Sequence, residues 1–192
     1  ALGDGVAGPL NPSQAEVVNI LQHNTQLLQH QIETLLRFNA AAFEARQLQR
    51  EPTDLLALVE EQIEAQRLRW QSHQLEVRAE GRSLVVPLDR QKMASAIGNL
   101  LSNAIRFSPP GGQIRLLLQS DAGMAHLHVI DQGPGVAKAD VQRIFEPFYR
   151  LPGASEREGG VGLGLALVKS IAERHSGSVR CEAREGDGAC FI

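Results

Sequence analysis

Four short motifs in a fixed order, between Asn99 and Leu165, constrain this chain more than any other feature of its sequence. Taken singly, each has an ordinary explanation, such as polar positions on a helix, a turn, or an aromatic anchor in a loop. The last motif stands before an apolar helical pattern and predicts a phosphate cradle, because free amides at a helix N-terminus favour anions. The motifs are Asn99-Leu-Leu-Ser-Asn103-Ala, Asp131-Gln-Gly133-Pro-Gly135, Phe145-Glu-Pro-Phe148 and Gly160-Val-Gly162-Leu-Gly164-Leu.

In this order the motifs resemble the N box, first glycine box, F box and second glycine box of the GHKL ATP-binding fold. The pattern is most similar to that of bacterial sensor histidine kinases, and the resemblance covers nearly the whole chain. It implies ATP, Mg²⁺ and phosphoryl transfer. It also implies an α+β architecture, a Bergerat-type α/β sandwich whose mixed sheet is covered by helices on one face, preceded by a long dimerisation helix.

Composition sets limits on the class of protein. Hydrophobic residues make up 43% and charged residues 21% of the chain, which is typical of a globular protein. A net charge of −3 gives no indication of nucleic acid or an anionic membrane surface as a partner. Cys181 and Cys190 do not form a CxxC pair and are expected to be reduced, although a hairpin around Gly186 would let them face each other.

A heptad pattern follows a Gly- and Pro-rich start. Residues 1–12 predict a loop, and a helix begins at Pro12, capped by Asn11 or Ser13. An apolar stripe of this length needs another chain or a further segment to cover it, so we expect a homodimer through the helix at 13–48. The two seams of the stripe are Leu21, Leu28, Leu35 and Ala42, and Val18, Thr25 and Ile32.

The rest of the chain predicts alternating strands and helices. Residues 51–54 predict a break, and Thr53 or Asp54 then caps a helix to about Arg69. We divide the chain into residues 1–50, part of a dimerisation and phosphotransfer region, and residues 51–192, the catalytic ATP-binding domain. The patterns predict strands at 74–79, 84–88, 113–119, 125–130, 179–183 and 189–192, helices at 89–106, 139–144 and 162–175, and a mobile loop at 146–160.

Asn99 and Asn103 lie four residues apart on the expected helix, so their side chains point the same way. The resemblance implies that Asn103 is the Mg²⁺ ligand, which suits a hard cation, and that Asn99 contacts phosphate or metal-bound water. It places Arg106 where the family usually has lysine, as a group that neutralises phosphate charge. It places Phe107 where an aromatic ring often stacks on adenine.

The resemblance places the adenine at Asp131, whose carboxylate would accept a hydrogen bond from the exocyclic amine. A carboxylate has no donor for the carbonyl of guanine, which is a physical basis for preferring ATP to GTP. Gly133 and Gly135 would let the backbone approach the base closely.

The F box would hinge a lid that contains Arg150 and Arg157, either of which can reach the terminal phosphates; the sequence leaves the choice open. The second glycine box is not a dinucleotide fingerprint, because a polar loop precedes it and its third glycine comes one residue early. The residues implied as phosphate-binding are Gly160, Gly162, Leu163 and Gly164.

The N box separates a kinase from a hydrolase. Related ATPases of this fold carry a glutamate four residues before the metal-binding asparagine, where it acts as a general base. This chain has Asn99 there, and an amide cannot accept the proton of an attacking water. A neutral imidazole needs less activation, so a phosphohistidine product is favoured, followed by transfer to an aspartate of a response-regulator receiver domain.

No His-Glu/Asp-x-x-x-Pro stretch occurs, and His23 and His30 lack the neighbouring acid and proline. We therefore expect an excised piece of the cytoplasmic portion of a sensor kinase, without its acceptor histidine, whose parent is anchored in the inner membrane by segments absent here. The alternatives are a non-catalytic GHKL regulatory module and a coiled-coil protein with an incidental α/β domain. The four intact boxes favour the kinase.

Overall fold

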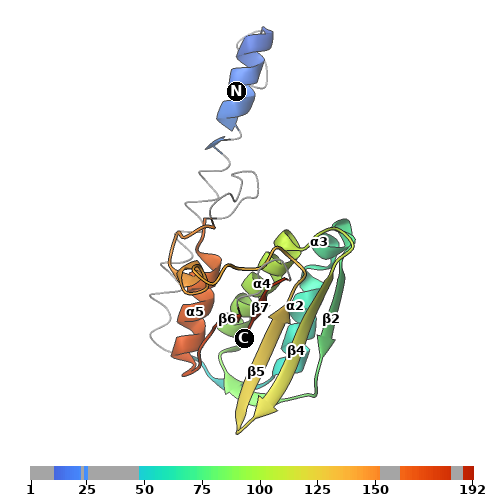
Figure 1. Ribbon diagram of the computed structural model, residues 1–192, viewed down its shortest axis with the longest axis vertical. Coiled ribbons are helices and arrows are strands. Elements are labelled where there is room, and N and C mark those ends of the chain that lie inside the picture. Colours follow the sequence, from blue (N-terminus) through green and yellow to red (C-terminus); the bar gives the residue numbers. More distant parts are fainter. Residues whose placement is uncertain (1–10, 23, 26–47, 152–160, 183–187) are drawn as a thin grey trace. The chain divides into compact units, whose positions relative to one another are not determined.

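The computed structural model describes residues 11–22, 24, 25, 48–151, 161–182 and 188–192, in two compact units of residues 1–40 and 41–192 (Figure 1). In the first unit, residues 12–22 are helical. The Oδ1 of Asn11 accepts the N–H of Gln14 at 2.8 Å, and the Oε1 of Gln14 accepts the N–H of Asn11 at 3.0 Å. This reciprocal pair is a capping box, and it confirms Asn11 as the cap.

The second unit is built on a five-stranded mixed sheet with the strand order β2-β4-β5-β7-β6 (Figure 1). β2 pairs parallel with β4, and the remaining neighbours pair antiparallel, so the predicted mixed sheet is confirmed. The strands are β2 (Glu76–Glu80), β4 (Gln113–Asp121), β5 (Met124–Ile130), β6 (Cys181–Glu182) and β7 (Cys190–Phe191).

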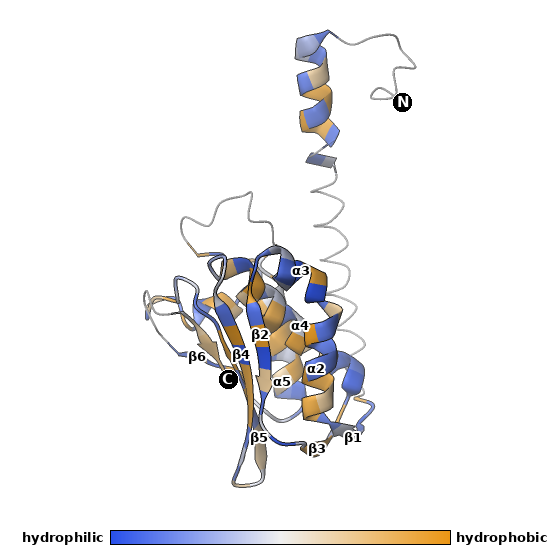
Figure 2. Ribbon diagram, turned by 90° about the vertical axis from the view of Figure 1, so that its right-hand side faces the viewer, coloured by the Kyte–Doolittle hydropathy of each residue, from blue (hydrophilic) through white to orange (hydrophobic). Residues whose placement is uncertain are grey.

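Helices α2 (Leu55–Ala65), α4 (Arg90–Phe107) and α5 (Gly164–Arg174) lie on one face of this sheet (Figure 2). Alternate residues of β4 are buried in the core beneath them, which is the period of two that a half-buried strand requires. These buried residues are Ile114, Leu116 and Leu118. The predicted α+β sandwich is therefore confirmed.

The structure corrects the prediction for residues 51–54. Glu51–Asp54 is not a break but strand β1, which pairs antiparallel with β3 (Val85–Leu88) in a separate two-stranded sheet. Pro52 and Pro87 are tolerated because each strand of a two-stranded sheet is an edge strand. Asp54 caps α2 as predicted, since its Oδ1 accepts the N–H groups of Leu56 and Ala57 at 3.0 and 3.4 Å.

Two predicted helices also differ. The helix expected through Arg69 is divided at Gln66, and a second short helix, α3 (Arg67–Ser72), follows. The helix expected at 139–144 is a set of turns that ends in the 3₁₀ segment η1 (Arg143–Phe145). The predicted heptad positions Leu28, Ile32, Leu35 and Ala42 lie outside the described residues.

The strand register settles how the two cysteines are related. Cys181 pairs with Phe191, and Cys190 pairs with Glu182. Directly opposite residues share a face of the sheet, so the two cysteines point to opposite faces. This register excludes the arrangement in which the two thiols face each other across the hairpin. Both cysteines are free thiols in the structure. Burial raises the pKa of the Cys181 thiol to about 12.

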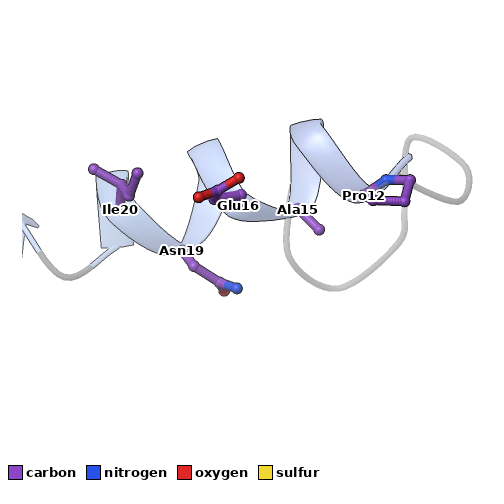
Figure 3. Close-up of a pocket in the computed structure, with 5 residues that line it drawn as sticks. All are labelled: Pro12, Ala15, Glu16, Asn19 and Ile20. Carbon is purple, nitrogen blue, oxygen red and sulfur yellow. The ribbon is translucent and has the colours of Figure 1, made fainter.

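No helix in the described ranges is long and apolar enough to cross a membrane. A hollow of about 530 Å³ lies against the helix of the first unit (Figure 3). It contains none of the four motifs, and exposed or half-exposed side chains of a single helix line it, so it is a surface feature rather than the functional site. Its lining residues are Pro12, Ala15, Glu16, Asn19 and Ile20.

Candidate functional site

The first two motifs meet where α4 ends. A Cβ placed on Gly133 would lie 2.8 Å from the carbonyl oxygen of Phe107 and 3.0 Å from Oδ1 of Asp131. Both distances are too short for any side chain, so a glycine is needed where the first glycine motif crosses the end of the N-box helix.

The first and last motifs meet between α4 and α5. Gly164 is the first residue of α5, and a Cβ there would lie 2.9 Å from Oδ1 of Asn99. The amide of Asn99 is held in place because its Nδ2 donates to the Ser95 carbonyl at 2.8 Å. The missing side chain at Gly164 therefore lets the start of α5 lie directly against Asn99.

The third and fourth motifs are joined by the backbone on either side of residues 152–160. The N–H of Phe148 donates to the carbonyl of Gly162 at 2.9 Å. Gly162 has a φ of +74°, and a Cβ there would lie 2.7 Å from the carbonyl oxygen of Tyr149. The four motifs are thus connected by three contacts: the first motif meets the second and the fourth, and the fourth meets the third.

Asp131 follows β5 and is 6% exposed. Its Oδ1 accepts the N–H of Gly133 at 2.8 Å and the N–H of Ala189 at 3.1 Å. Its Oδ2 accepts no hydrogen bond from the described residues. Burial raises the pKa of this carboxyl group, and the two backbone hydrogen bonds oppose that effect. Asp131 is thus a fixed carboxylate with one oxygen still able to accept.

Gly188 is a site residue that sequence reasoning assigned only to a turn. Its N–H donates to the Gly133 carbonyl at 3.0 Å, and a Cβ there would lie 1.9 Å from the carbonyl oxygen of Asp131. The N–H of Asp131 in turn donates to the carbonyl of Ala189 at 3.0 Å. The antiparallel pairing of β5 with β7 brings these residues together, and local sequence carries no signal for that long-range pairing.

Asn103 lies one turn after Asn99 on α4, and its Oδ1 accepts a hydrogen bond from Nη2 of Arg106 at 2.8 Å. The Arg106 guanidinium also lies 4.6 Å from the centre of the Phe107 ring, which is 37% exposed. The oxygen that the sequence assigns to a metal therefore interacts with an arginine in this structure.

Residues beside the F box, and the predicted positions not yet described, complete the site. Tyr149 donates from its hydroxyl to Oδ1 of Asp140 at 2.6 Å, which raises the pKa of the tyrosine, and the Arg143 guanidinium lies 4.4 Å from its ring centre. Arg150 is exposed, and Gly135 has a φ of +75°. The other two predicted positions, Arg157 and Gly160, lie outside the described residues.

Residues 88–192, which include all four motifs, match the sequence profile of the histidine kinase-, DNA gyrase B-, and HSP90-like ATPases. The chain belongs to this family. It is 42% identical to the sensor-like histidine kinase SenX3 of Mycolicibacterium smegmatis over 104 residues, 54% of this chain and 27% of SenX3. It is 32% identical to the histidine protein kinase DivJ of Caulobacter vibrioides over 185 residues, 94% of this chain and 31% of DivJ.

The chain thus spans less than a third of the length of SenX3 and of DivJ. Its fold is similar to the crystal structure of full-length ShkA in complex with AMPPNP, with a TM-score of 0.76 and 26% identity, covering 96% of this chain and 39% of that one. The GHKL resemblance and the fold that it implies are confirmed.

Proposed function

We propose that residues 51–192 are the ATP-binding catalytic domain of a sensor histidine kinase. In this proposal the γ-phosphate of ATP passes to a protein histidine and then to an aspartate of a response-regulator receiver domain. The observation that carries the proposal is the contact of all four motifs through Gly133, Gly162 and Gly164, where any side chain would disturb a neighbouring motif. The kinase names of SenX3 and DivJ support the choice of reaction.

The residues around Asp131 fit an adenine. The carboxylate is fixed by two backbone N–H groups on one oxygen, and its second oxygen remains to accept from an exocyclic amine. Gly133 and Gly188 add no side chain beside it. An acceptor without a donor at this position favours adenine over guanine.

The start of α5 fits phosphate groups. The helix begins without a side-chain cap, so its first amides remain available to an anion, as is usual at phosphate-binding helix N-termini. In this proposal the backbone amides at Gly162, Leu163 and Gly164 bind the phosphates, and Arg106 adds positive charge from α4. Arg150 and Arg157 remain candidates for the terminal phosphate.

The donor set also fits Mg²⁺. Asn103 would hold the ion through its amide oxygen, a ligand that suits a hard cation, and the ion would neutralise charge on the phosphates. This oxygen already accepts a hydrogen bond from Nη2 of Arg106 at 2.8 Å, and its second lone pair would be the one that meets the ion. Asn99 offers an amide and no base, so the chain does not activate water, and slow hydrolysis is expected.

Dimerisation through the helix at 13–48, pairing with a receiver domain, and a cytoplasmic position in a membrane-anchored parent are parts of the same proposal. They are supported by the sensor kinase relatives, among them GlrK of Escherichia coli, which is 30% identical over 99% of this chain. Light scattering over a wide concentration range tests the dimer directly, and a strict monomer contradicts it.

The reaction is tested by incubating the chain with radiolabelled ATP and Mg²⁺, with and without a phosphoacceptor helix from a sensor kinase supplied in trans. Acid-labile label on that helix is expected, with none on His23 or His30. Calorimetry with and without Mg²⁺ tests ATP binding separately. Binding of ATP without labelling of any supplied acceptor would favour the alternative, a non-catalytic nucleotide-binding regulatory module.

A further inference from the structure

The first described residues of the second unit contact the ends of α4 and α5 that lie farthest from the four motifs. The N–H of Gln49 donates to Oδ2 of Asp89, just before α4, at 3.1 Å. The Nη2 of Arg50 donates to the carbonyl of Arg174, the last residue of α5, at 3.2 Å. Along α5, this contact lies about 15 Å from Gly164, given a rise of 1.5 Å per residue.

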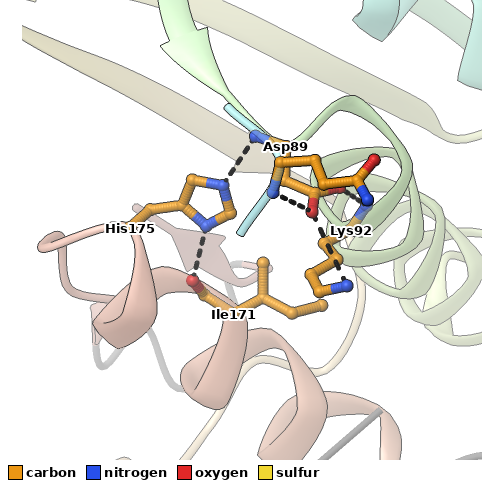
Figure 4. A network of polar contacts seen from close by, with 5 residues as sticks. Asp89, Lys92, Ile171 and His175 are labelled. Atoms are coloured by element: carbon orange, nitrogen blue, oxygen red, sulfur yellow. Dashed lines mark hydrogen bonds and ion pairs between the residues drawn. The ribbon is translucent and has the colours of Figure 1, made fainter. Parts of the chain in front are cut away.

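Asp89 and His175 join these ends to each other (Figure 4). The N–H of Asp89 donates to Nε2 of His175 at 3.0 Å. The Nδ1 of His175 lies 2.8 Å from the carbonyl of Ile171, which can only accept, so the ring is bound as the neutral tautomer with its proton on Nδ1. His175 thereby connects the start of α4 to the last turn of α5.

Asp89 is 6% exposed, and both oxygens of its buried carboxylate have partners. Its Oδ1 accepts the N–H of Lys92 at 3.1 Å and so caps α4, and the Lys92 ammonium lies 3.6 Å from Oδ2. Burial opposes ionisation of Asp89, but the hydrogen bonds from Lys92 and Gln49 together with the Lys92 charge outweigh it and lower its pKa. The folded structure therefore favours an ionised Asp89 carboxylate, which caps α4.

Helices α4 and α5 pack against each other, and two of their contacts lie at opposite ends of the pair. One is the Asp89–His175 hydrogen bond, and the other is the approach of Gly164 to Asn99 at the phosphate end. A helix held at both ends transmits a shift at one end to the other, because packed side chains leave few voids to absorb it. A shift of residues 49 and 50 should therefore also shift the phosphate-binding end of α5.

We propose that Asp89 and His175 are positioning residues, here called the latch, through which the Gln49-Arg50 segment sets the spacing of α4 and α5 and hence the affinity for nucleotide phosphates. The inference rests on the proposed function, because it takes the start of α5 as the phosphate site. Coupling of this kind is reciprocal: if docking of the segment strengthens phosphate binding, phosphate binding strengthens docking by the same factor.

The test compares ADP with adenosine, since only ADP reaches the start of α5. Gln49→Pro removes the backbone N–H that binds Asp89, and Gln49→Ala keeps it as the matched control. We expect Gln49→Pro to weaken ADP binding by about fivefold, at the low end of typical coupling, with adenosine binding unchanged. Equal ADP affinity in the two variants overturns the latch, and so does an equal loss for ADP and adenosine, which signals general destabilisation.

A second pair of variants keeps the test decisive if proline disturbs folding. His175→Leu removes both imidazole hydrogen bonds and is expected to weaken the binding of ADP but not that of adenosine. His175→Gln offers a new acceptor to the Asp89 N–H and is expected to recover part of the lost ADP affinity. In the unmodified chain, ADP should slow hydrogen exchange at the Gln49 amide, whereas adenosine should not. Unchanged exchange overturns the latch alone, and failure of the unmodified chain to bind ADP overturns the proposed function with it.

Discussion

The adenine end and the phosphate end of the candidate site are organised in opposite ways. Around Asp131, the backbone N–H groups of Gly133, just after β5, and Ala189, just before β7, bind one carboxylate oxygen and leave the other available. At the phosphate end, the polar side chains are bound to groups of their own helix: Asn99 to the Ser95 carbonyl and Asn103 to Arg106. The first end has its acceptor already in place, whereas at the second end the side chains that would meet the ligand also interact within their own helix.

This difference has a thermodynamic consequence. A preformed acceptor contributes its hydrogen bond without reorganisation, whereas a metal at Asn103 would share an oxygen that already accepts a hydrogen bond from Arg106. Changes that displace the backbone around Asp131 should therefore lower binding and stability together, whereas a change of only the carboxylate group that faces the ligand should lower binding alone. Changes at the phosphate end should act on binding alone.

The largest effect is expected for Gly188→Ala. Its Cβ would lie 1.9 Å from the Asp131 carbonyl oxygen, and the residue has a φ of +75°. Clash and backbone strain together should lower the free energy of unfolding by about 2–5 kcal/mol and abolish adenosine binding. Denaturant unfolding and calorimetry measure both quantities.

Gly111→Ala is the matched control for that variant, because it has a φ of +78° and no atom within 4 Å of the added Cβ. It should cost only the backbone strain, about 1–2 kcal/mol, and leave binding intact. If the two variants lose the same stability, the close packing at Asp131 is not what makes Gly188 necessary.

The next effect is expected for Asp131→Asn. The amide oxygen can still accept from Gly133 and Ala189, but its NH₂ group then faces the adenine amine, so two donors oppose each other. We expect a loss of about 1–3 kcal/mol in ATP affinity, measured by calorimetry, with little change in stability. The exposed residue Asp121 supplies the control, Asp121→Asn. Wild-type affinity in Asp131→Asn would place the adenine elsewhere.

At the phosphate end, Asn103→Ala should remove the Mg²⁺-dependent part of nucleotide binding, about tenfold if a lost ligand costs as much as a lost supporting group in other metal sites. Stability should change little, because the side chain is half-buried and, among the described residues, its hydrogen bond is made within its own helix. Titration of ADP with and without Mg²⁺ measures the effect, and Ser102→Ala, one residue away, is the control. Unchanged Mg²⁺ dependence with an intact fold moves the metal site away from α4.

The same two regions show how far sequence reasoning reaches. Asn99, Asn103 and Asp131 were predicted through the family resemblance, which rests on motifs that are local in sequence. Gly188 and Ala189 were not assigned to the site, since they reach Asp131 only through the pairing of β5 with β7. The hydrogen bond between Arg106 and Asn103 was also missed. The sequence interpretation assigned each residue to a ligand and did not consider a contact between the two side chains.

The fold shows the same limit. Helix α4 and the hairpin of β4 and β5 follow from strong periodicity and were predicted nearly to their ends. Strand β1 was missed because Pro52 argues against a strand, and an edge strand such as those of the β1–β3 ribbon tolerates it. Local signals thus predicted the elements, and tertiary pairing decided the exceptions.

The smallest effect concerns pH. At the adenine end, a change of pH should move adenosine affinity and the contribution of Asp131 to stability in opposite directions. Burial raises the pKa of Asp131, so the folded state holds a proton at pH values where the unfolded chain has lost it. Its contribution to stability therefore falls as pH rises from the unfolded pKa through the folded pKa. Binding needs the ionised carboxylate, so adenosine affinity should fall on acidification through the same window, by at most about tenfold per pH unit for one proton.

Adenosine is the suitable probe because it carries no titrating phosphate, and Asp131→Asn is the control that removes the proton. In the unmodified chain, acidification should weaken adenosine binding while the contribution of Asp131 to stability rises. In Asp131→Asn both slopes should flatten across that window. If adenosine affinity in the unmodified chain has the same pH dependence as in the variant, Asp131 does not contact the base, and the preformed adenine end loses its central residue.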